Sequence, residues 1–202
     1  MSFDTADNAR RSEHPVHPSF VERWSSRALT GEPIPDTDLL TCFEAARWAP
    51  SGFNAQPVRF VYAHRDSEDF GRLLGLLNEK NRSWAHKASA IIFVLSRKDF
   101  VFNGQTVQVH SHAFDAGAAW SAFAHQAHLL GYATRAIGGF DHKAAPIVLN
   151  LPNTHAVHVA VTIGRRAGLS DLPETFHAQE TPSARRPLHT FIHQGQFQGE
   201  SE

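Results

Sequence analysis

The chain has 202 residues, 42% of them hydrophobic, and a formal net charge of −1 at pH 7. This length suffices for one well-buried core, and the balanced charge offers no field that would attract nucleic acid or a membrane surface. The single cysteine, Cys42, excludes an internal disulfide and a CxxC zinc site. We therefore expect a globular protein of a reducing compartment, in the cytoplasm.

The N-terminal half alternates helical and extended patterns. Residues 1–17 are polar and are interrupted by Pro15, so we expect a flexible arm without the apolar segment of a signal peptide. The residues that follow predict helices at 18–27, 33–50 and 67–80 and strands at 58–63 and 90–96. The unbroken apolar run of the strand at 90–96 indicates a central position with both faces covered.

The C-terminal half continues the mixture of elements. It predicts a loop at 97–110, a long alanine-rich helix at 111–132, a short helix at 141–150, a strand at 155–164, and a final short helix at 185–193. No GxGxxG or GxxxxGK[ST] motif is present, which argues against a Rossmann or P-loop nucleotide site. We expect one α+β domain over residues 18–202, in which helices cover a central sheet.

Two arginine-rich segments are candidate phosphate sites. In "RWSSR", Arg23 and Arg27 would project from one side of a helix at i and i+4, beside two serines. Guanidinium forks and hydroxyl donors suit a phosphate, but a solvated basic face explains the pattern as well. The same two interpretations hold for Arg185 and Arg186 in "SARRPLHTF", near the end of the chain.

Two glycine-containing segments are candidate ring-binding sites. "APSGFNAQP" offers the carboxamides of Asn54 and Gln56, which could contact a heterocycle or simply form a turn before a strand. "RAIGGFD" contains Gly138 and Gly139, which permit close approach of a ligand to the backbone and equally suit a turn. Each segment alone is weak evidence for a site.

The order and spacing of these four segments over residues 18–193, together with "NRSWAHKASAIIFV", resemble the nitroreductase family of FMN-dependent oxidoreductases. The resemblance implies a mostly antiparallel central sheet, an intertwined homodimer and bound FMN. It implies transfer of hydride from NAD(P)H to a flat acceptor, a nitroaromatic or a quinone, by a ping-pong mechanism. A specialised enal or semialdehyde reductase, a flavin store or sensor without turnover, and a histidine-rich metal-binding module remain alternatives.

The resemblance also implies which residues bind the cofactor. Arg23 and Ser25 would hold the FMN phosphate with Arg185, Arg27 would lie near flavin N1 and O2, and Trp24 belongs to the same segment. A first group would line the ring and the ribityl chain from across the dimer interface: Pro50, Ser51, Gly52, Asn54 and Gln56. A second group would contact the ring: Asn81, Ile137, Gly138 and Gly139. No catalytic side chain is assigned, because the cofactor supplies most of the chemistry.

Two features depart from a simple assignment. Trp84 stands where many family members carry a lysine, so Trp84 would lie beside the ring edge and Arg27 would be the only side-chain cation near N1 and O2. The chain also has 14 histidines, among them His125 and His128 at helical i, i+3 spacing. Nothing in the sequence supplies further ligands for that pair, and we predict no metal site.

Overall fold

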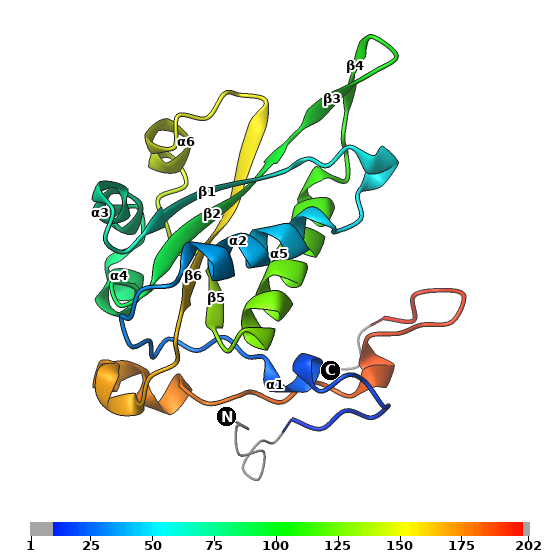
Figure 1. The fold of residues 1–202 in the computed structure, drawn as a ribbon. Coiled ribbons are helices and arrows are strands. Elements are labelled where there is room, and N and C mark those ends of the chain that lie inside the picture. Colours follow the sequence, from blue (N-terminus) through cyan, green and yellow to red (C-terminus); the bar gives the residue numbers. More distant parts are fainter. Residues whose placement is uncertain (1–9, 200–202) are drawn as a thin grey trace.

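The computed structural model describes residues 10–199, and a four-stranded sheet runs through its centre (Figure 1). The strands lie in the order β1-β2-β6-β5, and every neighbouring pair is antiparallel. Their bounds are β1 (Val58–His64), β2 (Ala90–Arg97), β6 (His155–Gly164) and β5 (Ala133–Ile137). The α+β class and the antiparallel sheet predicted from the sequence are confirmed.

Helices cover both faces of this sheet (Figure 1). On one face, α2 (Asp36–Arg47) packs against the long helix α5 (His112–Leu129). The other face carries three short helices, α3 (Glu68–Gly75), α4 (Glu79–Ala85) and α6 (Ala144–Val148). The fold therefore has three layers, with the sheet in the middle.

Strand β2 shows why the sheet is central. Its residues alternate between the two cores: Ile91, Phe93 and Leu95 pack under the short helices. Ile92 and Val94 instead face α2 and α5. All five are at most 2% exposed, and burial of each side chain contributes roughly 1.5–3 kcal/mol. The predicted central strand is confirmed.

The segment predicted as a loop at 97–110 is a β-hairpin, so that prediction was wrong. It consists of β3 (Asp99–Phe102) and β4 (Gln105–Gln108), which project beyond the main sheet (Figure 1). Asn103 and Gly104 connect them with positive φ angles of 49° and 75°. An Asn-Gly pair between extended segments is a strong hairpin signal. The hairpin was not predicted because its exposed strands lack the apolar alternation that indicates a strand.

Several predicted helices are shorter than expected or divided. The helix expected at 18–27 is limited to α1 (Ser19–Glu22), and the one at 185–193 is a 3₁₀ turn, Leu188–Thr190. The helix expected at 67–80 ends at Gly75, and α4 begins after a separate cap, the Asn78 side chain, which accepts from the Asn81 N–H at 2.9 Å. Strand β5 was not predicted, because its five residues carry no clear alternation.

The described ends of the chain run beside each other along one side of the domain (Figure 1). Residues 10–17 contain no helix or strand, and the first nine residues of the predicted arm lie outside the described range. The carboxylate of Glu13 accepts a hydrogen bond from the Leu188 N–H at 2.6 Å. Arg10 donates to the Arg23 carbonyl at 2.7 Å. Within residues 10–199, no helix has the length and apolar character needed to cross a bilayer.

Candidate functional site

Arg23 lies where two cavities meet. Helix α1 ends at Glu22, and the backbone becomes extended at Arg23, so the predicted i, i+4 arrangement of Arg23 and Arg27 on one helix is wrong. Arg23 and Ser25 line a cavity of about 330 Å³ against helix α5. Arg23 and Arg185 line a neighbouring cavity of about 460 Å³. The structure thus brings together the three residues predicted to hold a phosphate.

This region carries positive charge. Burial, and next the nearby Arg185 guanidinium, lower the pKa of Arg23 below its ordinary value. Burial and the same two arginines also lower the pKa of Arg10. Within residues 10–199, the hydrogen bonds of Arg185 go to neighbouring groups of its own segment, including the Ser183 carbonyl at 3.2 Å. Guanidinium groups gathered in this way fit an anion.

Arg135 was not predicted as a site residue, yet it lines the same cavity as Arg23 and Ser25. Its guanidinium donates to the Ser25 carbonyl at 2.6 Å. Burial, followed by the charge of Arg27, lowers the pKa of Arg135. Strand β5 places Arg135 in this cavity. The sequence could have identified Arg135 as a site residue only if that short strand had been recognised.

Arg27 faces the C-terminal tail. Its guanidinium lies 3.8 Å from the Glu180 carboxylate and 5.4 Å from the centre of the Phe176 ring. It also donates to the Gln179 side chain at 3.2 Å. The predicted contact of Arg27 with flavin N1 and O2 stays a prediction. Trp24, its neighbour in the sequence, stacks beneath the Arg166 guanidinium at 4.9 Å.

Asn81 and Gly139 contact each other directly. The Asn81 side-chain amide donates to the Gly139 carbonyl at 3.1 Å, and the Asn78 N–H donates to the same oxygen at 3.0 Å. A Cβ at Gly139 would lie 2.5 Å from the Asn78 amide and 2.6 Å from that of Asn81. Gly138, by contrast, faces open space, while Ile137 ends β5 as a buried residue. The close approach of the two asparagine side chains explains why position 139 is a glycine.

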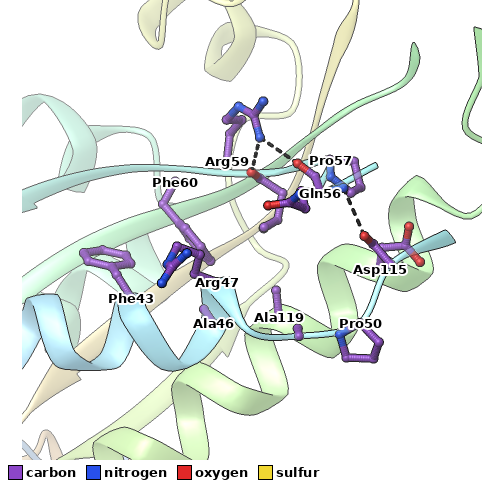
Figure 2. A pocket seen from close by; sticks show the side chains of 13 residues that line it. Phe43, Ala46, Arg47, Pro50, Gln56, Pro57, Arg59, Phe60, Asp115 and Ala119 are labelled. Carbon is purple, nitrogen blue, oxygen red and sulfur yellow. Dashed lines mark hydrogen bonds between the residues drawn. The ribbon is translucent and has the colours of Figure 1, made fainter. Parts of the chain in front are cut away.

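The turn at 50–57 forms a separate cavity of about 190 Å³ beside α2 (Figure 2). The backbone of Asn54 and Gln56 is left-handed, with φ angles of 53° and 46°. The Ser51 hydroxyl accepts from the Gln56 N–H at 3.0 Å, and the Gly52 N–H donates to the Asp115 carboxylate at 3.2 Å. These bonds hold the turn against the start of α5.

Helix α5 separates this turn from the arginine cavities. Asp115 and Ala119, at i and i+4, line the cavity of the turn. Ser121, Ala124 and His125 line the cavity of Arg23. With 100° per residue the two sets point to opposite sides of the helix. Within one chain, therefore, the two cavities open on different sides of α5.

Trp84 is a core residue. Its side chain is 1% exposed and packs in the cluster beneath the sheet, with the Arg135 guanidinium 5.9 Å from the ring centre. The predicted position beside a ring edge is therefore wrong, because the indole fills the interior of the domain. His125 and His128 contact Ser121 and Glu22 respectively. Residues 10–199 contain no group of three or more potential ligands placed to hold a metal ion.

Comparison with known proteins gives consistent matches. The model of the nitroreductase family matches residues 21–165. A structure described as an oxidoreductase containing FMN is 45% identical, covering 96% of this chain and 98% of that one, with a TM-score of 0.92. A provisionally named nitroreductase of Desulfovibrio desulfuricans, in complex with FMN, is 25% identical over 92% of this chain and 99% of that one, with a TM-score of 0.71.

One curated protein gives a shorter match. It comes from Streptomyces coelicolor and carries the provisional name NADH dehydrogenase/NAD(P)H nitroreductase. The two are 35% identical over 72 residues, so the match spans 36% of this chain and 35% of that protein.

Proposed function

The chain belongs to the nitroreductase family, and on that premise we propose that it is an FMN-dependent oxidoreductase that takes hydride from NAD(P)H. The observation that carries the proposal is the convergence of Arg23, Ser25, Arg135 and Arg185 on adjoining cavities. Two relatives with at least 25% identity are described as FMN proteins. The provisional name of the Streptomyces relative supplies NAD(P)H as the donor.

The residues present fit the phosphate of FMN. A phosphate group near neutral pH carries close to two negative charges, and Arg23 and Arg185 balance them. Both line one cavity, and no ion pair within the described residues joins either to a carboxylate. The lowered pKa of Arg23 reflects burial and like-charge repulsion, both of which a bound dianion compensates. Ser25 adds a hydroxyl at the border of the same site.

The residues around Gly138 and Gly139 fit the flat ring of FMN, at the opposite end of the cofactor from its phosphate. Gly138 has open space beside its backbone. The Asn78 N–H and the Asn81 side-chain amide both donate to the Gly139 carbonyl. Backbone N–H groups in this position are available to ring acceptors, as the predicted roles of Gly138 and Gly139 require. Arg135 provides a fixed guanidinium in the cavity nearby. A positive charge there favours a ligand that becomes anionic on reduction.

The bound FMN supplies the hydride chemistry, and the chain supplies binding, orientation and charge. Arg23, Ser25 and Arg185 fix the tail of the cofactor. Asn81, through its bond to the Gly139 carbonyl, holds the 138–139 backbone in place. No described side chain is assigned a proton-transfer role.

We also propose a homodimer, because α5 separates the turn at 50–57 from Arg23 within one chain. A second copy would bring its Pro50, Ser51 and Asn54 to the cofactor bound by the first. Large apolar side chains are exposed on the turn and the tail, with Phe53 at 88% and Phe197 at 73%. Contact with a second copy would remove such side chains from water.

The acceptor we propose is a planar nitroaromatic or quinone that enters the cleft after the nicotinamide has left. Phe53 at the exposed turn stacks with Phe100 of the β3–β4 hairpin, with ring centres 6.4 Å apart. Aromatic faces of this kind suit a flat acceptor. A cytoplasmic location and the arm at 1–17 stay predictions.

Anaerobic stopped-flow mixing tests this function. We expect NADPH or NADH to bleach the flavin absorbance within seconds and a quinone to restore it. Parallel lines in double-reciprocal plots would support a ping-pong cycle. Flavin that stays oxidised with both nucleotides would contradict an enzyme and favour a store or sensor. Intersecting lines would refute the ping-pong order alone.

A further inference from the structure

The 460 Å³ cavity extends beyond the position proposed for the FMN phosphate. Residues 10–16, helix α1 and residues 185–191 form its walls. Two hydrogen bonds join these walls: the Leu188 N–H donates to the Glu13 carboxylate, and the Arg10 guanidinium donates to the Arg23 carbonyl. Its volume lies in the range of small-molecule sites, roughly 300–1,000 Å³.

The cavity has more positive charge than one phosphate needs. Five arginines line it: Arg10, Arg11, Arg23, Arg185 and Arg186. Glu13 is the carboxylate among its lining residues, and its Oε1 atom already accepts from the Leu188 N–H. No hydrogen bond or ion pair within residues 10–199 uses the guanidinium groups of Arg11 and Arg186. After Arg23 and Arg185 have balanced the FMN phosphate, these two arginines remain for another anion.

The cavity also has an apolar side. Val16 and Phe20 come from the N-terminal end, and Leu188 and Phe191 from the tail. Phe20 and Phe191 are 59% and 61% exposed, so their rings have faces available for contact. Phosphate-binding guanidiniums beside exposed aromatic rings match the chemistry of a phosphorylated nucleoside, whose base stacks while its phosphate is paired.

We propose that this cavity binds the 2′-phosphoadenosine end of NADPH, and that Arg11 and Arg186 make the protein select NADPH over NADH. The inference rests on the proposed function, which provides a nicotinamide nucleotide as donor. NADPH differs from NADH by one phosphate ester with nearly two negative charges. A guanidinium fork binds such a group through two parallel hydrogen bonds, and arginine is the residue that accommodates this phosphate in other folds.

Calorimetric titration of the FMN-loaded protein tests the site directly, because the cofactor then occupies Arg23 and Arg185. The probes are 2′,5′-ADP, which carries the distinguishing phosphate, and 5′-AMP, which lacks it. We expect 2′,5′-ADP to bind at least tenfold more tightly, with an affinity that falls as salt is added. Equal affinities would overturn the proposal. If inorganic pyrophosphate binds as tightly as 2′,5′-ADP, the apolar side chains do not contact the adenosine, and that part of the proposal is overturned.

The double substitution Arg11→Ala and Arg186→Ala identifies the residues. We expect it to weaken 2′,5′-ADP at least tenfold and to lower kcat/KM for NADPH by a similar factor. Binding of 5′-AMP and kcat/KM for NADH should stay within twofold of the starting protein. The matched control is Lys98→Ala, which removes a cation at the junction of β2 and β3. An unchanged NADPH/NADH ratio in the double variant would overturn the assignment.

Failure of this inference and failure of the proposed function give different results. A protein that contains FMN and is reduced as well by NADH as by NADPH keeps its proposed function and loses the inference. A protein that retains no FMN, or whose FMN neither nucleotide reduces, loses the function first.

Discussion

The carboxylate of Glu180 and the segment of Arg27 are joined through both backbone and side chain. Glu180 Oε1 accepts from the backbone N–H groups of Arg27 and Ala28 at 2.7 Å and 3.0 Å, and its other oxygen lies 3.8 Å from the Arg27 guanidinium. The Glu180 side chain is 4% exposed. The tail is thereby fastened to the chain just beyond Arg23 and Ser25, the residues proposed to hold the phosphate.

Glu180→Gln should destabilise the protein, because the amide keeps the shape but removes the charge that pairs with Arg27. We expect the free energy of unfolding to fall by about 1–3 kcal/mol, measured by urea denaturation. Glu174→Gln, at an exposed position of the same segment, should change it by less than about 0.5 kcal/mol. Equal effects of the two substitutions would show that the buried carboxylate has no structural role.

Arg23→Glu should abolish retention of FMN, since it places a negative charge beside the cofactor phosphate. We expect the flavin content after gel filtration to fall below a tenth of the original. Lys98→Glu makes the same change of charge outside the cavities that Arg23 lines and should keep the flavin. If Arg23→Glu retains its flavin while folded, the phosphate assignment is refuted.

Gly139→Ala should be far more harmful than Gly138→Ala. The added Cβ at Gly139 meets two amide nitrogens within 2.6 Å, whereas nothing lies within 4 Å at Gly138. Overpacking of this kind costs about 1–3 kcal/mol, and the shift should also break the bond from Asn81 to the Gly139 carbonyl. Thermal denaturation of both variants gives the comparison; similar melting temperatures would contradict the close packing.

His158 should make stability fall at acidic pH. Burial, and next the neighbouring His112, lower the pKa of His158, and the Ser96 hydroxyl bonds both rings at 2.6 Å and 2.7 Å. The unfolded chain, with a histidine pKa near about 6.5, binds more protons than the folded one at lower pH. Stability is therefore full above this pH and declines as the pH falls below it.

His158→Gln should flatten that dependence below about pH 6.5, as measured by urea denaturation at several pH values. His189→Gln, at an exposed tail position, is the control and should leave the slope unchanged. A slope that His158→Gln does not reduce would mean that other groups cause the loss, such as His128 and His155, whose pKa values burial also lowers.

Long apolar patterns predicted the fold well. The run of β2 identified a central strand because nearly every residue there is buried; α2 was found from its apolar spacing, and α5 from its length and alanine content. Short elements were not found. Strand β5 has only five residues and no apolar alternation, and the β3–β4 hairpin is largely exposed, so burial imposes no pattern on the hairpin.

The candidate site shows a similar division. The arginine and glycine segments were predicted from their order along the chain, and the structure brings Arg23 to Arg185 and Asn81 to Gly139. Arg135 could not be predicted without β5. The burial of Trp84 and the pairing of Arg27 with Glu180 depend on contacts between segments far apart in sequence, which spacing does not reveal.

The most direct test is the visible spectrum of the purified protein, with the released cofactor identified by chromatography. We predict a flavin spectrum and close to one FMN per chain, either as purified or after reconstitution. A colourless protein that binds no added FMN would contradict the account, because the arginines around Arg23 would then serve another anion.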